Sequence, residues 1–289
     1  MPALMLSVFT DEVSDDFEVA CRIAAEEFEL RWVELRKLWG KNIMLLDGRE
    51  LAEARRILGR YGLRVSQIGG PLFKTDLKGA PLSSERPKRD TFGDFTWDQQ
   101  PEVLERGLEL CKVFQCDRLR CFDFWRLEDP LPFHTQIDEE LGKAASACGK
   151  QRVTLSMENE FACNTRTGAE AKRTLAAVKS PWFKLNWDPG NAYFAGEDPF
   201  PGGFSQLPVA RISNVHIKDA ARDDAGKYQW LPVGKGKIDF VGQFRALAKA
   251  GYRGPITLET HYRGAVTAEA STRESMAGLK AALKGAGLL

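Results

Sequence analysis

VTLSMENE, residues 153–160, is the first of four similar segments on which the expected fold depends. The other three are FKLNWDPGN (183–191), ISNVHIKD (212–219) and PITLETHY (255–262). Each alternates with the period of two that is typical of a β-strand, so its apolar side chains share one face and its polar side chains the other. The polar faces end in residues of metal-ligand type, which are, in chain order, Glu158, Asp188, His216 and Glu259.

The stretches between these segments can hold helices, which predicts that successive strands run parallel. Upstream, the same reasoning predicts strands over 4–9, 32–36, 63–68 and 117–122. Helices are predicted over 14–28, 47–61, 101–114, 136–150, 167–179, 238–251 and 267–284. Strands that alternate with helices indicate an α/β protein with a single domain over residues 1–289, a (β/α)8 barrel. A doubly wound open sheet is the second possibility, but no GxGxxG or P-loop motif follows a strand.

Two long stretches lack clear periodicity. Residues 71–98 are rich in Pro, Gly, Ser and charge, and are expected to form a partial lid or a mobile surface loop. Residues 189–204, PGNAYFAGEDPFPGGF, have the Gly and Pro punctuation of a loop.

In a barrel, the carboxyl ends of the strands meet at one mouth, so the four polar faces converge there. Three carboxylates that converge in a partly buried site repel one another unless a cation lies between them. Three oxygen ligands and one imidazole suit Mn²⁺ best, and Mg²⁺, Co²⁺ or Zn²⁺ also fit. Glu160 lies on the same face as Glu158, one step further along, and could be the ligand in its place or a substrate contact.

The composition narrows the classes of partner and compartment. A formal net charge of +1 gives no basic field for nucleic acid or for an anionic membrane. No apolar run reaches membrane-spanning length, and MPALMLSVFTDE predicts a first strand rather than a signal peptide. The six cysteines show no CxxC spacing, as expected for free thiols in a reducing compartment, so a cytoplasmic protein is predicted.

With these residues identified, the sequence resembles the sugar phosphate isomerase/epimerase family, the xylose isomerase-like TIM barrels. The resemblance is carried by SMENE, WDPGN, HIKD and LETH, and by LPVGKGKIDF followed by GYRGPITLE. It implies one divalent metal ion held by Glu158, Asp188, His216 and Glu259. It also implies that the two glutamates exchange protons with a small-molecule sugar, and that the protein can be a homo-oligomer.

The resemblance extends to candidate substrate contacts. Arg222 lies six positions after His216, where the ketose epimerases place a substrate-binding arginine, although it could equally be a solvated loop residue. Asn191 and Glu160 stand where relatives carry histidine, and this difference leaves the substrate open. Two further candidates are Lys218, on the polar face of the third segment, and Trp39, whose ring can stack on a sugar or pack within its own loop.

The expected reaction is proton transfer beside a carbonyl. One glutamate removes a proton from a ketose or keto-sugar to give a cis-enediolate. Return of a proton to the other face by the second glutamate gives epimerisation, and return to the neighbouring carbon gives isomerisation. Loss of a β-oxygen from the same intermediate would instead make the protein a lyase of an inosose or a 3-keto-glycoside. Two less favoured functions are an endonuclease IV-like nuclease, which the count of three histidines disfavours, and a non-catalytic sugar-binding protein.

Overall fold

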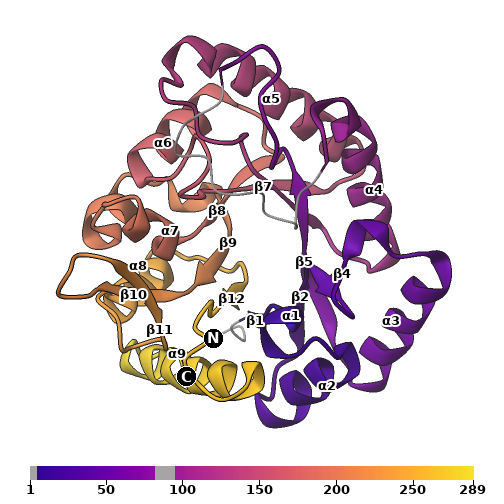
Figure 1. Cartoon of the computed structure of the whole chain (residues 1–289), viewed down its shortest axis with the longest axis vertical. Coiled ribbons are helices and arrows are strands. Elements are labelled where there is room, and N and C mark those ends of the chain that lie inside the picture. Colours follow the sequence, from indigo (N-terminus) through magenta and orange to yellow (C-terminus); the bar gives the residue numbers. More distant parts are fainter. Residues whose placement is uncertain (1–4, 82–94) are drawn as a thin grey trace.

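Parallel strands form a ring around the centre of the molecule, as the computed structural model shows for residues 5–81 and 95–289 (Figure 1). The order around the ring is β1-β12-β9-β8-β7-β6-β5-β2. A parallel bridge between Phe9 and Glu34 joins the two ends of this order, so the barrel is nearly closed. The strands are β1 (Leu6–Val8), β2 (Trp32–Leu35), β5 (Arg64–Leu72), β6 (Arg118–Cys121), β7 (Thr154–Glu158), β8 (Phe183–Trp187), β9 (Ile212–Ile217) and β12 (Ile256–Leu258).

Helices form the outer layer of the barrel (Figure 1). The outer helices are α2 (Phe17–Arg22), α3 (Gly48–Arg60), α4 (Gln100–Val113), α5 (His134–Lys150), α6 (Gly168–Ala177), α8 (Phe240–Lys249) and α9 (Ala268–Gly285). The short helices α1 (Thr10–Val13) and α7 (Pro189–Phe194) follow β1 and β8 and lie nearer the barrel mouth. Several begin at a side chain that accepts a hydrogen bond from the first turn, and α3 and α6 have complete capping boxes at Asp47 and Thr167. The predicted single-domain (β/α)8 architecture is the one observed.

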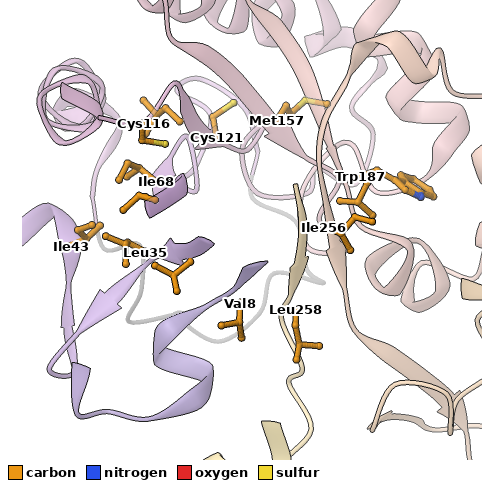
Figure 2. Close-up of a cluster of buried hydrophobic side chains, with 14 of the residues drawn as sticks. Val8, Leu35, Ile43, Ile68, Cys116, Cys121, Met157, Trp187, Ile256 and Leu258 are labelled. Carbon is orange, nitrogen blue, oxygen red and sulfur yellow. The ribbon is translucent and has the colours of Figure 1, made fainter. Parts of the chain in front are cut away.

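The apolar faces of the strands point outward, toward the helices. Val8, Leu35, Met157 and Leu258, on four different strands, are completely buried in this layer (Figure 2). Burying each such side chain stabilises the fold by about 1.5–3 kcal/mol. The layer of packed side chains therefore fixes which face of every strand turns toward the barrel axis.

The inside of the barrel is polar and hydrogen-bonded. Ser156 and Ser213 contact each other at 2.6 Å between their Oγ atoms. Asn214 on β9 donates to Glu34 on β2 at 3.0 Å, and these two strands are not neighbours in the ring. Contacts of this kind cross the interior, so the polar faces meet as predicted from the period of two.

The third predicted strand is longer than expected. The sequence predicts that it ends at residue 68, but β5 continues through Gly69, Gly70 and Pro71 to Leu72. A Cβ atom on Gly69 would lie 2.8 Å from Phe9 Cε1, and one on Gly70 would lie 2.6 Å from Met44 Cε. These glycines therefore allow close packing within a strand instead of forming a turn.

The region after Asp188 also differs from the prediction of a loop. Pro189–Phe194 is the helix α7, followed by a π-helical turn over Pro199–Gly203. The predicted helix over 14–28 is divided into α2 and a π-helical stretch, Ile23–Glu27. Two hairpins were not predicted: β3 (Lys37–Leu38) with β4 (Lys41–Asn42), and β10 (Asp219–Arg222) with β11 (Tyr228–Leu231).

The expected lid over 71–98 lies partly outside the described residues, which omit 82–94. On either side of that gap, Phe73 and Trp97 pack against Phe124, with ring centroids 4.9 and 5.3 Å away. Across the described parts of the chain, 5–81 and 95–289, every helix is too short or too polar to cross a membrane.

Candidate metal centre

The four predicted ligand residues come together at the carboxyl ends of neighbouring strands. Glu158 is the last residue of β7, Asp188 and Glu259 follow β8 and β12 directly, and His216 lies near the end of β9. These residues, called the quartet below, offer ligand atoms that all lie within 4.8 Å of one another. His216 Nδ1 is 3.4 Å from Glu158 Oε1, 3.5 Å from Glu259 Oε2 and 3.9 Å from Asp188 Oδ2. All four side chains are buried.

Glu34, on β2, fixes the orientation of the His216 ring. Its Oε2 lies 3.2 Å from His216 Nε2, so that nitrogen donates to the carboxylate while Nδ1 faces the other quartet residues. The side-chain amide of Asn186 also lies 3.0 Å from Nδ1. Burial lowers the pKa of His216, but the carboxylates of Glu34 and Glu158 outweigh burial and raise it to about 10. A carboxylate on the far ring nitrogen is the usual support for a metal-binding histidine.

Two arginines hold the outer oxygens of the two glutamates. Arg120, on β6, donates to Glu158 Oε2 at 2.9 Å, and Arg36 donates to Glu259 Oε1 at 2.5 Å. In each glutamate the other carboxylate oxygen is directed toward the shared centre, near His216 Nδ1. Each glutamate is thus held at one oxygen and presents the other.

The pKa values of the two glutamates follow from these contacts. Burial raises the pKa of Glu158, but His216 and Arg120 outweigh burial and hold it below its ordinary value. Burial acts in the same direction on Glu259, while Lys218, His261 and Arg36 together hold its pKa well below the ordinary value. Both glutamates are therefore carboxylates near neutral pH.

Asp188, the third carboxylate of the quartet, contacts the side chain of Lys218. The Lys218 ammonium lies 2.8 Å from Asp188 Oδ2 and 2.9 Å from Glu259 Oε2. Burial, with Glu158 and Glu259 close by, nevertheless raises the pKa of Asp188 to about 7, against the effect of Lys218. Asp188 Oδ2 is buried and accepts no hydrogen bond of normal geometry within the described residues. Divalent cations bind carboxylate oxygens and imidazole nitrogens, and this unsatisfied oxygen lies beside two more carboxylates and an imidazole. The quartet therefore fits a metal ion.

The remaining predicted site residues lie at different distances from the quartet. Asn191, in α7, donates to Glu158 Oε1 at 3.1 Å, and its backbone N–H donates to Asp188 Oδ1. Glu160 is buried two residues after Glu158 and lies 3.9 Å from Lys74 Nζ.

Arg222 is exposed on the β10–β11 hairpin, where it packs on Tyr228. Trp39 is 38% exposed and packs edge-on against Phe17. The structure thus brings Asn191 to the quartet and places Arg222 and Trp39 in contacts elsewhere.

Sequence reasoning missed Glu34, Arg36 and Arg120. The only signal for them was parity, because each lies on the polar face of its predicted strand.

A second group of possible ligands, Glu12 with Glu259 and His261, also has its ligand atoms close together. Arg36 and Arg263 already neutralise the Glu12 carboxylate in it. Of the three histidines, His216 belongs to the quartet, His261 Nε2 lies 3.3 Å from Glu259 Oε1, and His134 begins α5.

Fold and site together define a barrel protein with a buried cluster of three carboxylates and one imidazole, able to hold a cation, at the carboxyl ends of its strands. Residues 22–282 match the model of the xylose isomerase-like TIM barrel family, and the chain belongs to this family. SgbU of Escherichia coli strain K12 is 27% identical over 163 residues, which cover 55% of this chain and 56% of SgbU. UlaE, an L-ribulose-5-phosphate 3-epimerase of Escherichia coli ATCC 8739, is 27% identical over 211 residues, which cover 72% of this chain and 70% of UlaE.

Solved structures share the fold at lower identity. The IolI protein with a bound zinc atom superposes with a TM-score of 0.74 at 14% identity, over 98% of both chains. The D-allulose 3-epimerase of a Methylomonas species, in complex with D-allulose, gives a TM-score of 0.69 at 17% identity, over 98% of this chain and 97% of that one. These similarities extend over nearly the whole barrel and support its fold.

Proposed function

We propose that the protein is a divalent-metal-dependent sugar epimerase or isomerase, in which Glu158 and Glu259 act as the acid/base pair on a ketose or keto-sugar. The observation that carries the proposal is the arrangement of these glutamates. Each is held by an arginine at one oxygen, and each presents its other oxygen to the same centre. The epimerase UlaE, a relative that aligns over most of its own length, supports the same class of reaction.

The quartet would hold the metal ion, and its three carboxylate oxygens and one imidazole nitrogen favour Mn²⁺. Such an ion supplies Lewis-acid polarisation of the substrate carbonyl when it is bound. The six cysteines are all buried and unpaired, which supports a reducing, cytoplasmic location.

The glutamates perform the proton transfer. One carboxylate removes the proton from the carbon beside the carbonyl, and the electron pair of that C–H bond moves toward the carbonyl to give an enediolate. The second glutamate takes a proton from solvent and delivers it to the opposite face of the enediolate, which inverts the carbon. Arg120 and Arg36 keep each carboxylate pointed at the centre through both steps, and Asn191 adds a hydrogen bond to Glu158.

The test is exchange in D₂O. Protein loaded with Mn²⁺ is incubated with ketoses, inososes and 3-keto-glycosides, and deuterium beside the carbonyl is followed by NMR and mass spectrometry. We expect deuterium in the substrate and in an epimer or isomer of it. A product that has lost water would assign the lyase reaction instead. No deuterium in any member of the panel would exclude proton transfer at this centre.

Glu158→Gln and Glu259→Gln test the acid/base assignment. Each change should lower the rate of exchange by roughly 10²–10⁴-fold, because the amide cannot accept the substrate proton. Far-UV circular dichroism should show an intact fold. Glu53→Gln, on the exposed surface of α3, is the matched control and should leave exchange unchanged. Activity at the unsubstituted level in either quartet variant would remove the assignment.

A further inference from the structure

Glu160 and Lys74 lie beside the quartet, Glu160 on the same strand end as Glu158 and Lys74 at the end of a further strand. Glu160 follows β7 with the same parity as Glu158, and Lys74 follows β5. The Lys74 ammonium lies 4.8 Å from the centroid of the Phe122 ring and 5.5 Å from that of Trp125. The Arg120 guanidinium, which binds Glu158, lies 4.9 Å from the same Phe122 centroid. Lys74 is thus linked to the quartet through one aromatic ring.

The geometry of this pair leaves Glu160 able to accept further hydrogen bonds. Its Oε2 is 3.9 Å from Lys74 Nζ, a distance at which the charges attract without forming a hydrogen bond. Within the described part of the chain, its Oε1 receives only a 3.5 Å contact from the Ala162 N–H. Both side chains keep about a tenth of their surface exposed, 12% for Lys74 and 10% for Glu160. Glu160 therefore presents a carboxylate oxygen that can accept from a hydroxyl group.

The charge at this position disfavours a phosphate group. A phosphate dianion is bound by cations or N–H groups whose charge is not already balanced. Here Glu160 balances the ammonium of Lys74 and would repel an anion. The neighbouring cations Arg120, Arg36 and Lys218 each contact a quartet carboxylate already.

We propose that Glu160 and Lys74, with the rings of Phe122 and Trp125, form a subsite for an uncharged, hydroxyl-bearing part of the substrate. The substrate is then an unphosphorylated ketose or keto-sugar, in contrast to the substrate named for the UlaE relative. Glu160 accepts from a sugar hydroxyl, Lys74 donates to one, and the ring edges contact C–H groups. This inference rests on the proposed function, because it concerns the substrate of the same centre.

The experiment compares free ketoses with their phosphate esters on the Mn²⁺-loaded full chain. L-Ribulose and D-allulose are paired with L-ribulose 5-phosphate and D-allulose 6-phosphate. Isothermal titration calorimetry gives the dissociation constants, and D₂O exchange gives kcat/KM. We expect each free ketose to bind at least about tenfold more tightly than its ester, since a like charge at close range costs on the order of 1 kcal/mol or more.

Charge-swap variants separate this subsite from a structural ion pair. Glu160→Lys leaves two cations and should shift the ratio of free-ketose to ester affinity toward the ester by at least tenfold. The double variant Glu160→Lys with Lys74→Glu restores one charge of each sign and should return the preference to the free ketose. Glu53→Lys makes the same charge change on the surface of α3 and should not alter the ratio. Circular dichroism confirms that each variant is folded.

The outcomes distinguish this inference from the proposed function. Binding of free ketoses without deuterium exchange would remove the proposed function and keep the subsite. Exchange with a preference for phosphate esters would keep the function and overturn the subsite. A ratio that does not change in Glu160→Lys would also overturn the subsite, and so would an absence of binding by all free ketoses.

Discussion

Three of the quartet residues at the barrel mouth are each paired with a second side chain. The quartet residue faces the shared centre, and the second side chain fixes its orientation through a hydrogen bond. His216 is held by Glu34, Glu158 by Arg120, and Glu259 by Arg36. The first member of each pair was predicted from the sequence, because the period of two and the end of a strand identify it. The second member was not, because these contacts depend on strand register and side-chain reach. Glu34 and Arg36 meet partners from strands that are not neighbours of β2 in the ring, and Arg120 meets its partner from the adjacent strand.

Glu34→Gln tests the support of His216. The amide can present its NH₂ group to Nε2, which removes the carboxylate that keeps this nitrogen protonated and Nδ1 available. We expect the affinity for Mn²⁺, measured by isothermal titration calorimetry, to fall roughly 10–100-fold. Glu197→Gln is the matched control, because Glu197 is partly buried outside the quartet and accepts from the Gly168 N–H. Equal affinities of the Glu34 variant and the unsubstituted protein would contradict the assigned role.

Helices and strands were predictable to different degrees. Long elements with a repeated pattern, such as α3, α4 and β7, lie within a few residues of their predicted bounds. The helix α7 was missed because six residues with Pro and Gly show no 3.6-residue period. Its N-cap is Asp188, which accepts from the Asn191 N–H, so the quartet residue both begins a helix and faces the centre. The extension of β5 was missed because its two glycines are required by packing that the sequence does not reveal.

The capping box of α3 gives a prediction for a single element. Asp47 accepts from the Arg49 and Glu50 N–H groups, and Glu50 accepts in return from the Asp47 N–H. Asp47→Ala should lower the free energy of unfolding by about 1 kcal/mol in urea denaturation. Asp47→Asn keeps an accepting oxygen and should cost only a few tenths of that amount. Equal losses in the two variants would show that charge, and not the cap hydrogen bond, stabilises the helix.

The barrel was predictable from the sequence because eight predicted strands alternate with helices, and the strands that end in the quartet have one apolar face and one polar face. The sequence did not reveal the contacts across the interior, such as Asn214 with Glu34, since these depend on strand register. It also did not reveal how buried charges change the stability of the whole fold with pH. Asp123, two residues after the end of β6, is such a titratable group and is completely buried.

Asp123 makes stability depend on pH. Burial raises its pKa to about 6, although its Oδ1 accepts from the Thr165 N–H at 3.0 Å. The folded protein therefore binds this proton more tightly than the unfolded chain does. The contribution of protonated Asp123 to the free energy of unfolding is fully present below about pH 4 and is lost as the pH rises through about 6. It amounts at most to roughly 3 kcal/mol.

Asp123→Asn removes this titration. Relative to the unsubstituted protein, the variant should gain stability between pH 4.5 and pH 7.5, by about 1–3 kcal/mol in urea denaturation. The new amide group changes the free energy of unfolding by the same amount at both pH values. The test is therefore whether the stability difference between variant and unsubstituted protein changes from about pH 4.5 to about pH 7.5. A difference that stays constant with pH would show that Asp123 is already ionised in the folded state at pH 4.5.

The ring also divides the centre between the two halves of the chain. Every quartet residue comes from the second half, whereas Glu34, Arg36 and Arg120 come from the first. The candidate ligands and the three side chains that hold them therefore lie on separable stretches of polypeptide. An exchange of the first half with that of another family member would change these three supports and leave the candidate ligands, with Lys218 and Asn191, in place.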